Sequence, residues 1–217
     1  MSQRTYHQFC SIAYALDVIG DRWTLLIVRE LRFGPRRFTD LKRALDGIGS
    51  HLLTKRLKQM QADGLVEHQK LPPPAATSVY GLAERGRALE PVILALRDWG
   101  APLMMPKMGS DDCLTVASAM GSLKNVLFSA EKAASTTLTA EIHAQGDVFT
   151  ATIANGEIDL RFGLAEKADV IFSAELKPLL AVFNQQITIP AALANGIITL
   201  KAGDEATLTR FLNCFQL

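Results

Sequence analysis

The sequence predicts an α+β protein with two domains, and three observations support this expectation. Residues 38–82 have the pattern of two short helices followed by two strands, with basic side chains gathered along them. Residues 138–201 contain alternating apolar and polar runs, which are typical of strands with one buried face. Residues 106–112 lie between these regions and read as a linker. We therefore expect a first domain at residues 1–105 and a second at 113–217.

A first helix is expected at residues 39–45, followed by a glycine-containing turn at 47–49. Leu41 and Leu45 would face inward on this helix. Arg36 and Arg37 stand immediately before it, where they would reach phosphate oxygens beside a helix N-terminus.

The second helix should be amphipathic. Leu53, Leu57 and Met60 recur at i, i+4 and i+7, so they form one apolar stripe that faces inward. At about 100° per residue, the remaining face bears positive charge and hydrogen-bonding groups. Its residues are His51, Thr54, Lys55 and Lys58, with Ser50 as the expected N-cap. Such a face suits insertion into a DNA groove, as in a helix-turn-helix.

Two short strands should follow, at residues 65–69 and 78–82. The prolines in segment 70–77 cannot lie inside a paired strand, so this segment should be an exposed hairpin tip. The hairpin would be the wing of a winged helix-turn-helix, with His68 and Lys70 on the phosphate backbone. The alternative is an amphipathic helix pair whose basic face is only solvated and binds nothing. The two strands that follow the helices argue against this alternative.

An ordered series of short motifs resembles the HxlR-type winged-helix transcription regulators, which are relatives of the MarR group. The motifs run from Cys10 to Trp99 and comprise residues 19–27 (IGDRWTLLI), 29–31, 37–41, 48, 53–57, 63–66 and 80–86. Two departures are visible, because Ser11 stands where the family often has proline and a triple proline alters the wing. The resemblance implies a DNA-binding dimer formed by the N-terminal helices and the helix after the wing. It also implies that Cys10 could sense oxidants or electrophiles, the alternative being a small buried residue.

Charge is divided unequally between the two halves. Residues 1–105 carry 15 Lys and Arg against 10 Asp and Glu, a net +5, whereas residues 106–217 carry 8 against 12, a net −4. The sum is the +1 of the whole chain. The positive surplus therefore lies with the helix-turn-helix, where it would favour DNA by phosphate neutralisation.

A longer helix should follow the wing. Its apolar residues at i, i+3, i+4 and i+7 are Leu89, Val92, Ile93 and Leu96, and Trp99 continues the same face. We interpret this stripe as a dimer interface, because dimers commonly read two half-sites about 34 Å apart. The alternative is that the stripe packs on the wing domain of its own chain.

The second region predicts an antiparallel sheet with helices packed on it. Strands are expected at residues 138–143, 148–154, 157–162, 168–173 and 197–201, with turns at Gly146-Asp147 and Asn155-Gly156. Helices should cover residues 176–183, begin at Pro190, and follow Asp204, which suits an N-cap.

The order of these elements, together with segments 168–173 and 194–204, resembles the sterol carrier protein two fold. That resemblance implies a tunnel for apolar or amphipathic ligands between sheet and helices. The candidate lining residues are Phe149, Phe162, Phe172, Phe183, Phe211 and Phe215. The alternative is that these rings are simply core, since a sequence does not show voids.

Catalytic and metal-binding patterns are missing from the sequence. It contains no nucleophile elbow, zincin motif, Walker loop or dinucleotide fingerprint. His7, His51, His68 and His143 are scattered, and Cys10, Cys113 and Cys214 lack paired spacing. We expect no enzyme, no metal and no cofactor. The odd cysteine count and the lack of a long apolar run favour the cytoplasm and no membrane association.

These patterns together predict a homodimeric regulator, most simply a repressor, that binds a near-palindromic operator in double-stranded DNA. The expected DNA contacts are Arg36, Arg37, Thr39, Ser50, His51, Thr54, Lys55, Lys58, His68 and Lys70. The second domain would bind an apolar or amphipathic effector. The alternatives are a second domain that is only a structural or protein-interaction module and, third, a lipid carrier.

Overall fold

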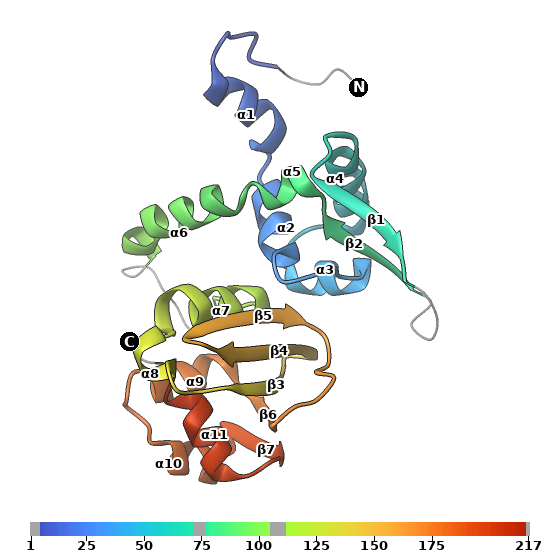
Figure 1. The fold of residues 1–217 in the computed structure, drawn as a ribbon. Helices are drawn as coiled ribbons and strands as arrows, with labels where there is room; N and C mark the ends of the chain where they lie inside the picture. The colour runs from blue at the N-terminus through green and yellow to red at the C-terminus, as the bar shows by residue number, and fades with distance from the viewer. Residues whose placement is uncertain (1–4, 72–76, 105–111, 216–217) are drawn as a thin grey trace. The chain divides into compact units, whose positions relative to one another are not determined.

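The computed structural model describes residues 5–71, 77–104 and 112–215 (Figure 1). These residues fall into two compact units, Met1–Asp112 and Cys113–Leu217. Most of the expected linker and the expected hairpin tip around the triple proline lie outside the described residues.

The N-terminal unit is a helical domain with one hairpin. Its elements are α1 (Ser11–Ile19), α2 (Thr24–Leu31), α3 (Phe38–Ala44), α4 (Ser50–Ala62), β1 (Val66–Lys70), β2 (Ser78–Leu82), α5 (Glu84–Arg87) and α6 (Glu90–Met104). Strands β1 and β2 pair antiparallel, with Val66 opposite Leu82. Arg36 adds an isolated bridge to Tyr80 of β2, so the segment before α3 is tied to the hairpin. This order of two short helices and a hairpin is that of a winged helix-turn-helix.

The core of this unit is built from the apolar stripes of its helices. Leu53, Leu57 and Met60 of α4 are buried, as the helical spacing predicts, and they join Leu41 of α3 in one cluster. The N-cap prediction for α4 is wrong: Gly49 occupies the cap without a side-chain hydrogen bond, and Ser50 is the first helical residue. The helix begins one residue earlier than the predicted cap implies, because Gly49 already has the extended backbone of a cap.

Gly86 in α5 lies against the backbone that follows α4. A Cβ built on Gly86 would stand 2.0 Å from the carbonyl oxygen of Leu65. Gly86→Ala is therefore expected to lower the free energy of unfolding by about 1–3 kcal/mol, because backbone must move to admit the methyl group. Urea unfolding followed by tryptophan fluorescence measures this unit alone, since both tryptophans, Trp23 and Trp99, belong to it.

Gly81 provides the matched control for this substitution. A Cβ there would meet Pro35 at an ordinary 3.6 Å, so Gly81→Ala should leave stability within about 0.5 kcal/mol. Equal stability of the two variants would show that the close approach at Gly86 carries no constraint.

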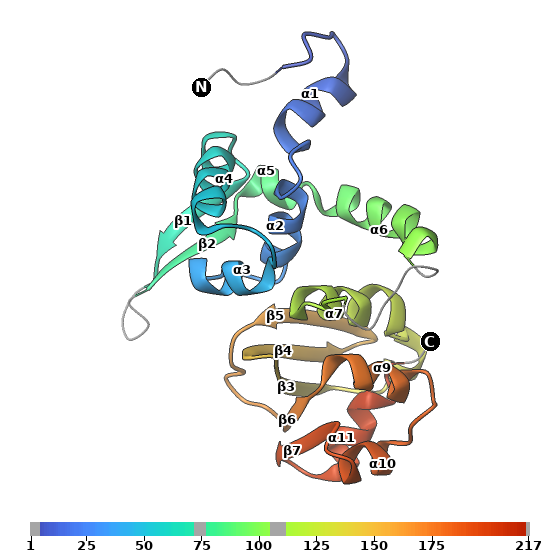
Figure 2. The same cartoon turned by 180° about the vertical axis from the view of Figure 1, so that it is seen from behind.

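The C-terminal unit is a five-stranded sheet with helices. Its elements are α7 (Val116–Ser122), a π-helical turn η2 (Leu123–Leu127), α8 (Ala130–Ala133), β3 (Leu138–Ala144), β4 (Asp147–Ala154), β5 (Glu157–Phe162), β6 (Val170–Ala174), α9 (Leu176–Phe183), α10 (Ile189–Ala194), β7 (Ile198–Ala202) and α11 (Glu205–Leu212). The strand order is β5-β4-β3-β6-β7. Figure 2 shows α9 and α11 from the other side of this sheet.

The expectation of a purely antiparallel sheet is wrong, because β3 and β6 run parallel. The segment between β5 and β6 takes the chain past β4 and β3 to the far side of β3. Three hydrogen bonds with β3 hold this segment: Ala165 N–H donates to the Glu141 carboxylate at 3.0 Å, Asp169 N–H donates to the Thr139 carbonyl at 2.8 Å, and Thr139 N–H donates to the Asp169 carboxylate at 2.8 Å. Because this segment carries the chain back to the end of the sheet where β3 begins, β6 runs parallel to β3 and the sheet is mixed.

Turns and caps of this unit follow local sequence closely. Asn155 and Gly156 both have positive φ, as a two-residue hairpin turn requires. The preceding turn lies one residue earlier than expected, at Gln145 and Gly146, because Asp147 already starts β4. The Asp204 side chain caps α11 by accepting from the Thr207 N–H, a hydrogen bond that lowers the pKa of Asp204.

The phenylalanines expected to line an apolar pocket lie mostly in the core. Phe172 contacts Phe211 at a ring-centroid distance of 5.9 Å, and Phe215 lies 5.0 Å from Phe211 and 5.7 Å from Phe183. Phe149 is also buried, whereas Phe162 at the end of edge strand β5 is only partly so. Because these rings are in contact with one another, the volume between them is occupied, and they form part of the core.

Candidate nucleic-acid interface

Helix α4 presents its polar face to solvent. Ser50, His51, Thr54, Lys55 and Lys58 are all exposed, on the side of α4 away from the buried stripe. The Thr54 hydroxyl donates to the carbonyl of Ser50 at 2.9 Å, a local bond within the helix. This face offers two ammonium groups, an imidazole and hydroxyls on one rigid element, which suits base edges and phosphates.

An ion pair anchors α4 to the segment before α2. Arg56 of α4 contacts the carboxylate of Asp21, whose other oxygen accepts from the Trp23 N–H at 2.9 Å. Arg56 is therefore used for positioning the helix, whereas Lys55 and Lys58 beside it have no ion-pair partner among the residues that the structure describes.

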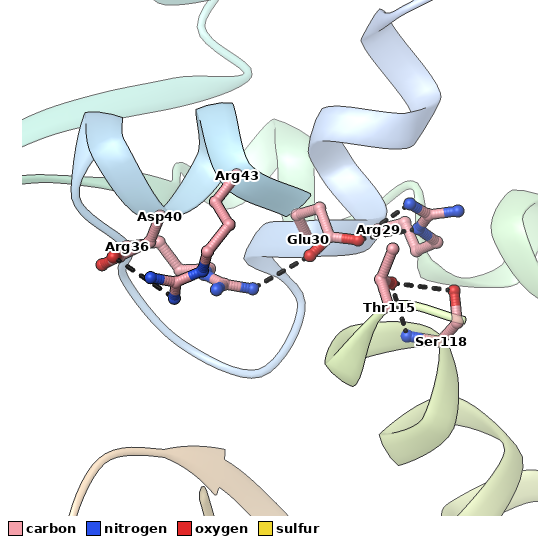
Figure 3. Close-up of polar contacts among 7 residues, drawn as sticks. All are labelled: Arg29, Glu30, Arg36, Asp40, Arg43, Thr115 and Ser118. Atoms are coloured by element: carbon pink, nitrogen blue, oxygen red, sulfur yellow. Dashed lines mark hydrogen bonds and ion pairs between the residues drawn. The ribbon is translucent and has the colours of Figure 1, made fainter. Parts of the chain in front are cut away.

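The two arginines before α3 have different places. Arg37 is exposed at the N-cap of α3, and Thr39 is exposed in its first turn. The expectation that Arg36 contacts phosphate is wrong, because its side chain is buried and its Nη1 donates to the buried Glu30 carboxylate at 2.9 Å. Figure 3 shows Glu30 between Arg36 and Arg29, which donates to its other oxygen from Nη2 at 2.8 Å.

Sequence reasoning missed the role of Glu30. It lies three residues after Ile27 on the buried side of α2, and its side chain has no solvent exposure. A carboxylate on the apolar face of a helix needs a buried cation, so this signal predicts a buried partner for Glu30 without saying which arginine supplies it. The ion pair between Glu30 and Arg36 links α2 to the segment that bridges Tyr80. Its role is therefore to hold the wing in position, not to contact DNA.

The wing residues that the structure describes carry polar groups outward. His68 and Lys70 are exposed on β1, and the His68 ring lies 4.7 Å from the ring of Tyr80 on β2. The exposed cations of β1, α4 and the α3 cap belong to one compact unit.

Helix α6 exposes apolar side chains. Val92, Leu96 and Trp99 are exposed, and among the described residues of α6 none is buried. Leu89 and Ile93 do pack against the core of this unit, so the expected stripe is split between inward and outward residues. Helix α1 likewise exposes Ile12, Tyr14 and Leu16.

The cysteines are free thiols with different surroundings. Cys10 is exposed at the N-cap of α1, and Cys113 is exposed as well. Cys214 is buried, and this burial raises the pKa of its thiol. Across the described ranges, no group of three or more His, Cys, Asp or Glu side chains could hold a metal ion, and no helix is long and apolar enough to cross a membrane.

Comparison with known proteins assigns relatives to the N-terminal unit. The model of the HxlR-like helix-turn-helix family matches residues 18–108. The chain is 34% identical over 94 residues to the uncharacterized HTH-type transcriptional regulator YybR of Bacillus subtilis (strain 168), covering 42% of this chain and 73% of that protein. It is 36% identical over 93 residues to YdeP of the same organism, covering 42% and 71%. The crystal structure of a putative HTH-type transcriptional regulator, ytcD, matches 45% of this chain and 99% of its own at 31% identity, with a TM-score of 0.42.

Proposed function

This chain belongs to the HxlR-like helix-turn-helix family of DNA-binding transcription regulators, and from that premise we propose that it acts as a homodimeric repressor on a near-palindromic operator. The observation that carries the proposal is the exposed polar face of α4, with Lys55 and Lys58 outward and Leu53 and Leu57 buried behind them. We assign base reading to Ser50, His51, Thr54, Lys55 and Lys58, and phosphate contacts to Arg37, Thr39, His68 and Lys70.

Fluorescence anisotropy tests this assignment directly. Purified protein is titrated onto the DNA upstream of its own gene and onto a scrambled duplex of equal length, across a range of salt concentrations. We expect tight binding to the upstream duplex and a steep loss of affinity with salt, because phosphate neutralisation releases counterions. Weak, equal binding to both duplexes would contradict sequence-specific recognition at that site.

The dimer proposal is supported by the exposed apolar residues of α6. Leu96→Glu is expected to raise the dimer dissociation constant by about a hundredfold or more, because two leucines lose burial and two charges enter the interface. Sedimentation velocity across protein concentrations measures the shift. Val126→Glu is the matched control, since Val126 is similarly exposed but lies in the C-terminal unit. If Leu96→Glu leaves the dimer dissociation constant unchanged, α6 is not part of the dimer interface.

We further propose that the C-terminal unit senses a small molecule and passes its binding to the DNA-binding state. Such a ligand must bind one state more tightly than the other, since equal affinity shifts nothing. The packed phenylalanines give no support to an apolar effector, although a titration with fatty and aromatic acids tests that class. A second candidate role is a structural or protein-interaction module, which predicts operator affinity that no small molecule alters.

A further inference from the structure

The C-terminal unit has a cavity of about 520 Å³ at one end of its sheet, and this cavity is open to solvent. This volume lies in the range of small-molecule sites, roughly 300–1,000 Å³. Its walls come from β3, β4, β6 and β7 and from the turns next to them, and the phenylalanines expected to line a pocket are not part of it. The hollow is therefore a different place from the apolar core.

Strand register aligns polar side chains across this cavity. His143 of β3 is opposite Ser173 of β6, and Ser173 is opposite Thr199 of β7. Directly opposed residues share one face of a sheet, so these three side chains form a row across neighbouring strands. Lys201 stands two residues beyond Thr199 on β7 and also lines the cavity. The row supplies an imidazole, two hydroxyls and an ammonium group.

The imidazole in this row is held by a neighbouring carboxylate on the same strand. His143 Nε2 lies 2.8 Å from Oε1 of Glu141, whose side chain is buried and whose Oε2 accepts from the Ala165 N–H at 3.0 Å. The contact with Glu141 therefore fixes the orientation of the imidazole ring within the row.

The cavity also carries charges of both signs on separate elements. Lys201 lies on edge strand β7, whereas Glu175 follows β6 at the rim, and within the described chain neither side chain has an ion-pair partner. Asp147 at the start of β4 adds a second carboxylate. One ammonium beside two carboxylates disfavours nucleotides and other polyanions, and the small apolar side chains of the lining disfavour long acyl chains.

From this arrangement we infer that the cavity binds a small zwitterion, an amino acid or short peptide, as the effector of the regulator. The inference rests on the proposed sensing role of this unit. Lys201 with the Ser173 and Thr199 hydroxyls would bind the ligand carboxylate, and Glu175 would bind its ammonium group. The polar row would then read the remaining hydrogen-bonding groups of the ligand.

Isothermal titration of the full-length protein with each of the twenty amino acids and with diglycine tests the inference. We expect binding of at least one of these probes. Lys201→Ala and Glu175→Gln should each weaken it about tenfold or more, because each removes a charge-assisted hydrogen bond. Both residues are exposed, so neither change should unfold the protein. Lys124→Ala, an exposed lysine outside the cavity, is the control and should leave binding unchanged.

Three outcomes would overturn the inference: binding of none of these probes, binding that both cavity variants leave intact, or binding of dodecanoate in preference to every amino acid. Operator anisotropy on the same protein preparation separates this failure from failure of the regulator itself. If the protein binds the operator but no amino acid, the proposed regulator role holds and the proposed ligand site is wrong. If it binds neither, the proposed function is wrong as well.

Discussion

Glu30→Ala is expected to lower the free energy of unfolding of the N-terminal unit by about 3–5 kcal/mol, the range for breaking a buried ion pair from one side. The Glu30 side chain is 0% exposed and that of Arg36 is 2% exposed, with 2.9 Å between Oε2 and Nη1. Removing the carboxylate takes away the Glu30 oxygen that helps to offset the desolvation of the buried Arg36 guanidinium. Arg29 also loses its contact with Glu30 but is partly exposed, so water can replace it.

Urea unfolding followed by tryptophan fluorescence measures this change, since both tryptophans lie in the unit concerned. Arg43→Ala is the matched control: its pair with Asp40, at 3.6 Å, is partly exposed and should contribute about 0–1 kcal/mol (Figure 3). The double variant Glu30→Leu with Arg36→Met should recover most of the loss, because apolar residues of similar volume often replace a buried pair. A loss below about 1 kcal/mol for Glu30→Ala would mean that Arg36 finds solvent or another anion.

The consequence for DNA binding lies in the wing. Arg36 exchanges two backbone hydrogen bonds with Tyr80 of β2, at 2.9 and 2.8 Å, while its side chain is held by Glu30 of α2. One carboxylate therefore fixes the segment before α3 and, through it, the hairpin. Glu30→Ala should weaken operator binding even at temperatures where the unit stays folded, because the wing loses a fixed attachment.

The features that the sequence alone predicts are those determined by residues close together in the chain. The apolar stripe of α4 appears as a repeat of Leu53, Leu57 and Met60, and burial follows the same spacing. Asn155 and Gly156 tolerate positive φ, so their hairpin could be expected without knowledge of the sheet. Asp204 caps α11 through a residue three positions away. Each of these depends on contacts within one or two turns of chain.

The features that were missed depend on contacts between distant elements. Nothing near Arg36 distinguishes it from Arg37, and only the three-dimensional place of Glu30 draws one arginine inward while the other stays exposed. The parallel pairing of β3 and β6 depends on the path of the segment between β5 and β6. Side-chain spacing places the phenylalanines on inward faces, but whether inward rings enclose a void depends on volumes that spacing does not specify.

The polar cavity illustrates the same limit. His143, Ser173 and Thr199 come from three strands widely separated in sequence, and they meet only because β6 lies between β3 and β7. In the sequence His143 appears as a solitary histidine on the polar face of a strand. Its significance comes from the buried Glu141 beside it and the hydroxyls in register with it.

Lys55→Ala and Lys58→Ala are each expected to weaken operator binding by about 1–3 kcal/mol for each protomer of the dimer, the range for a side chain that reaches a guanine edge. Both residues are exposed on α4, whose opposite face is fixed in the core by Leu53 and Leu57. Because the substitutions change exposed side chains, the stability of the fold should not change, and the loss reports contact with DNA.

The design separates base reading from phosphate binding by comparing two duplexes and several salt concentrations. Loss of Lys55 or Lys58 should lower affinity for the operator more than for a scrambled duplex, so the ratio of the two affinities falls. Arg37→Ala should instead weaken both duplexes alike and reduce the salt slope by about 1.8, twice the value of about 0.9 for one phosphate contact, because the dimer loses one contact in each protomer. Lys124→Ala, in the C-terminal unit, should change neither quantity. If both α4 variants keep full operator affinity, the face assigned to base reading is wrong; if they behave like Arg37→Ala, α4 contacts phosphates and specificity arises elsewhere.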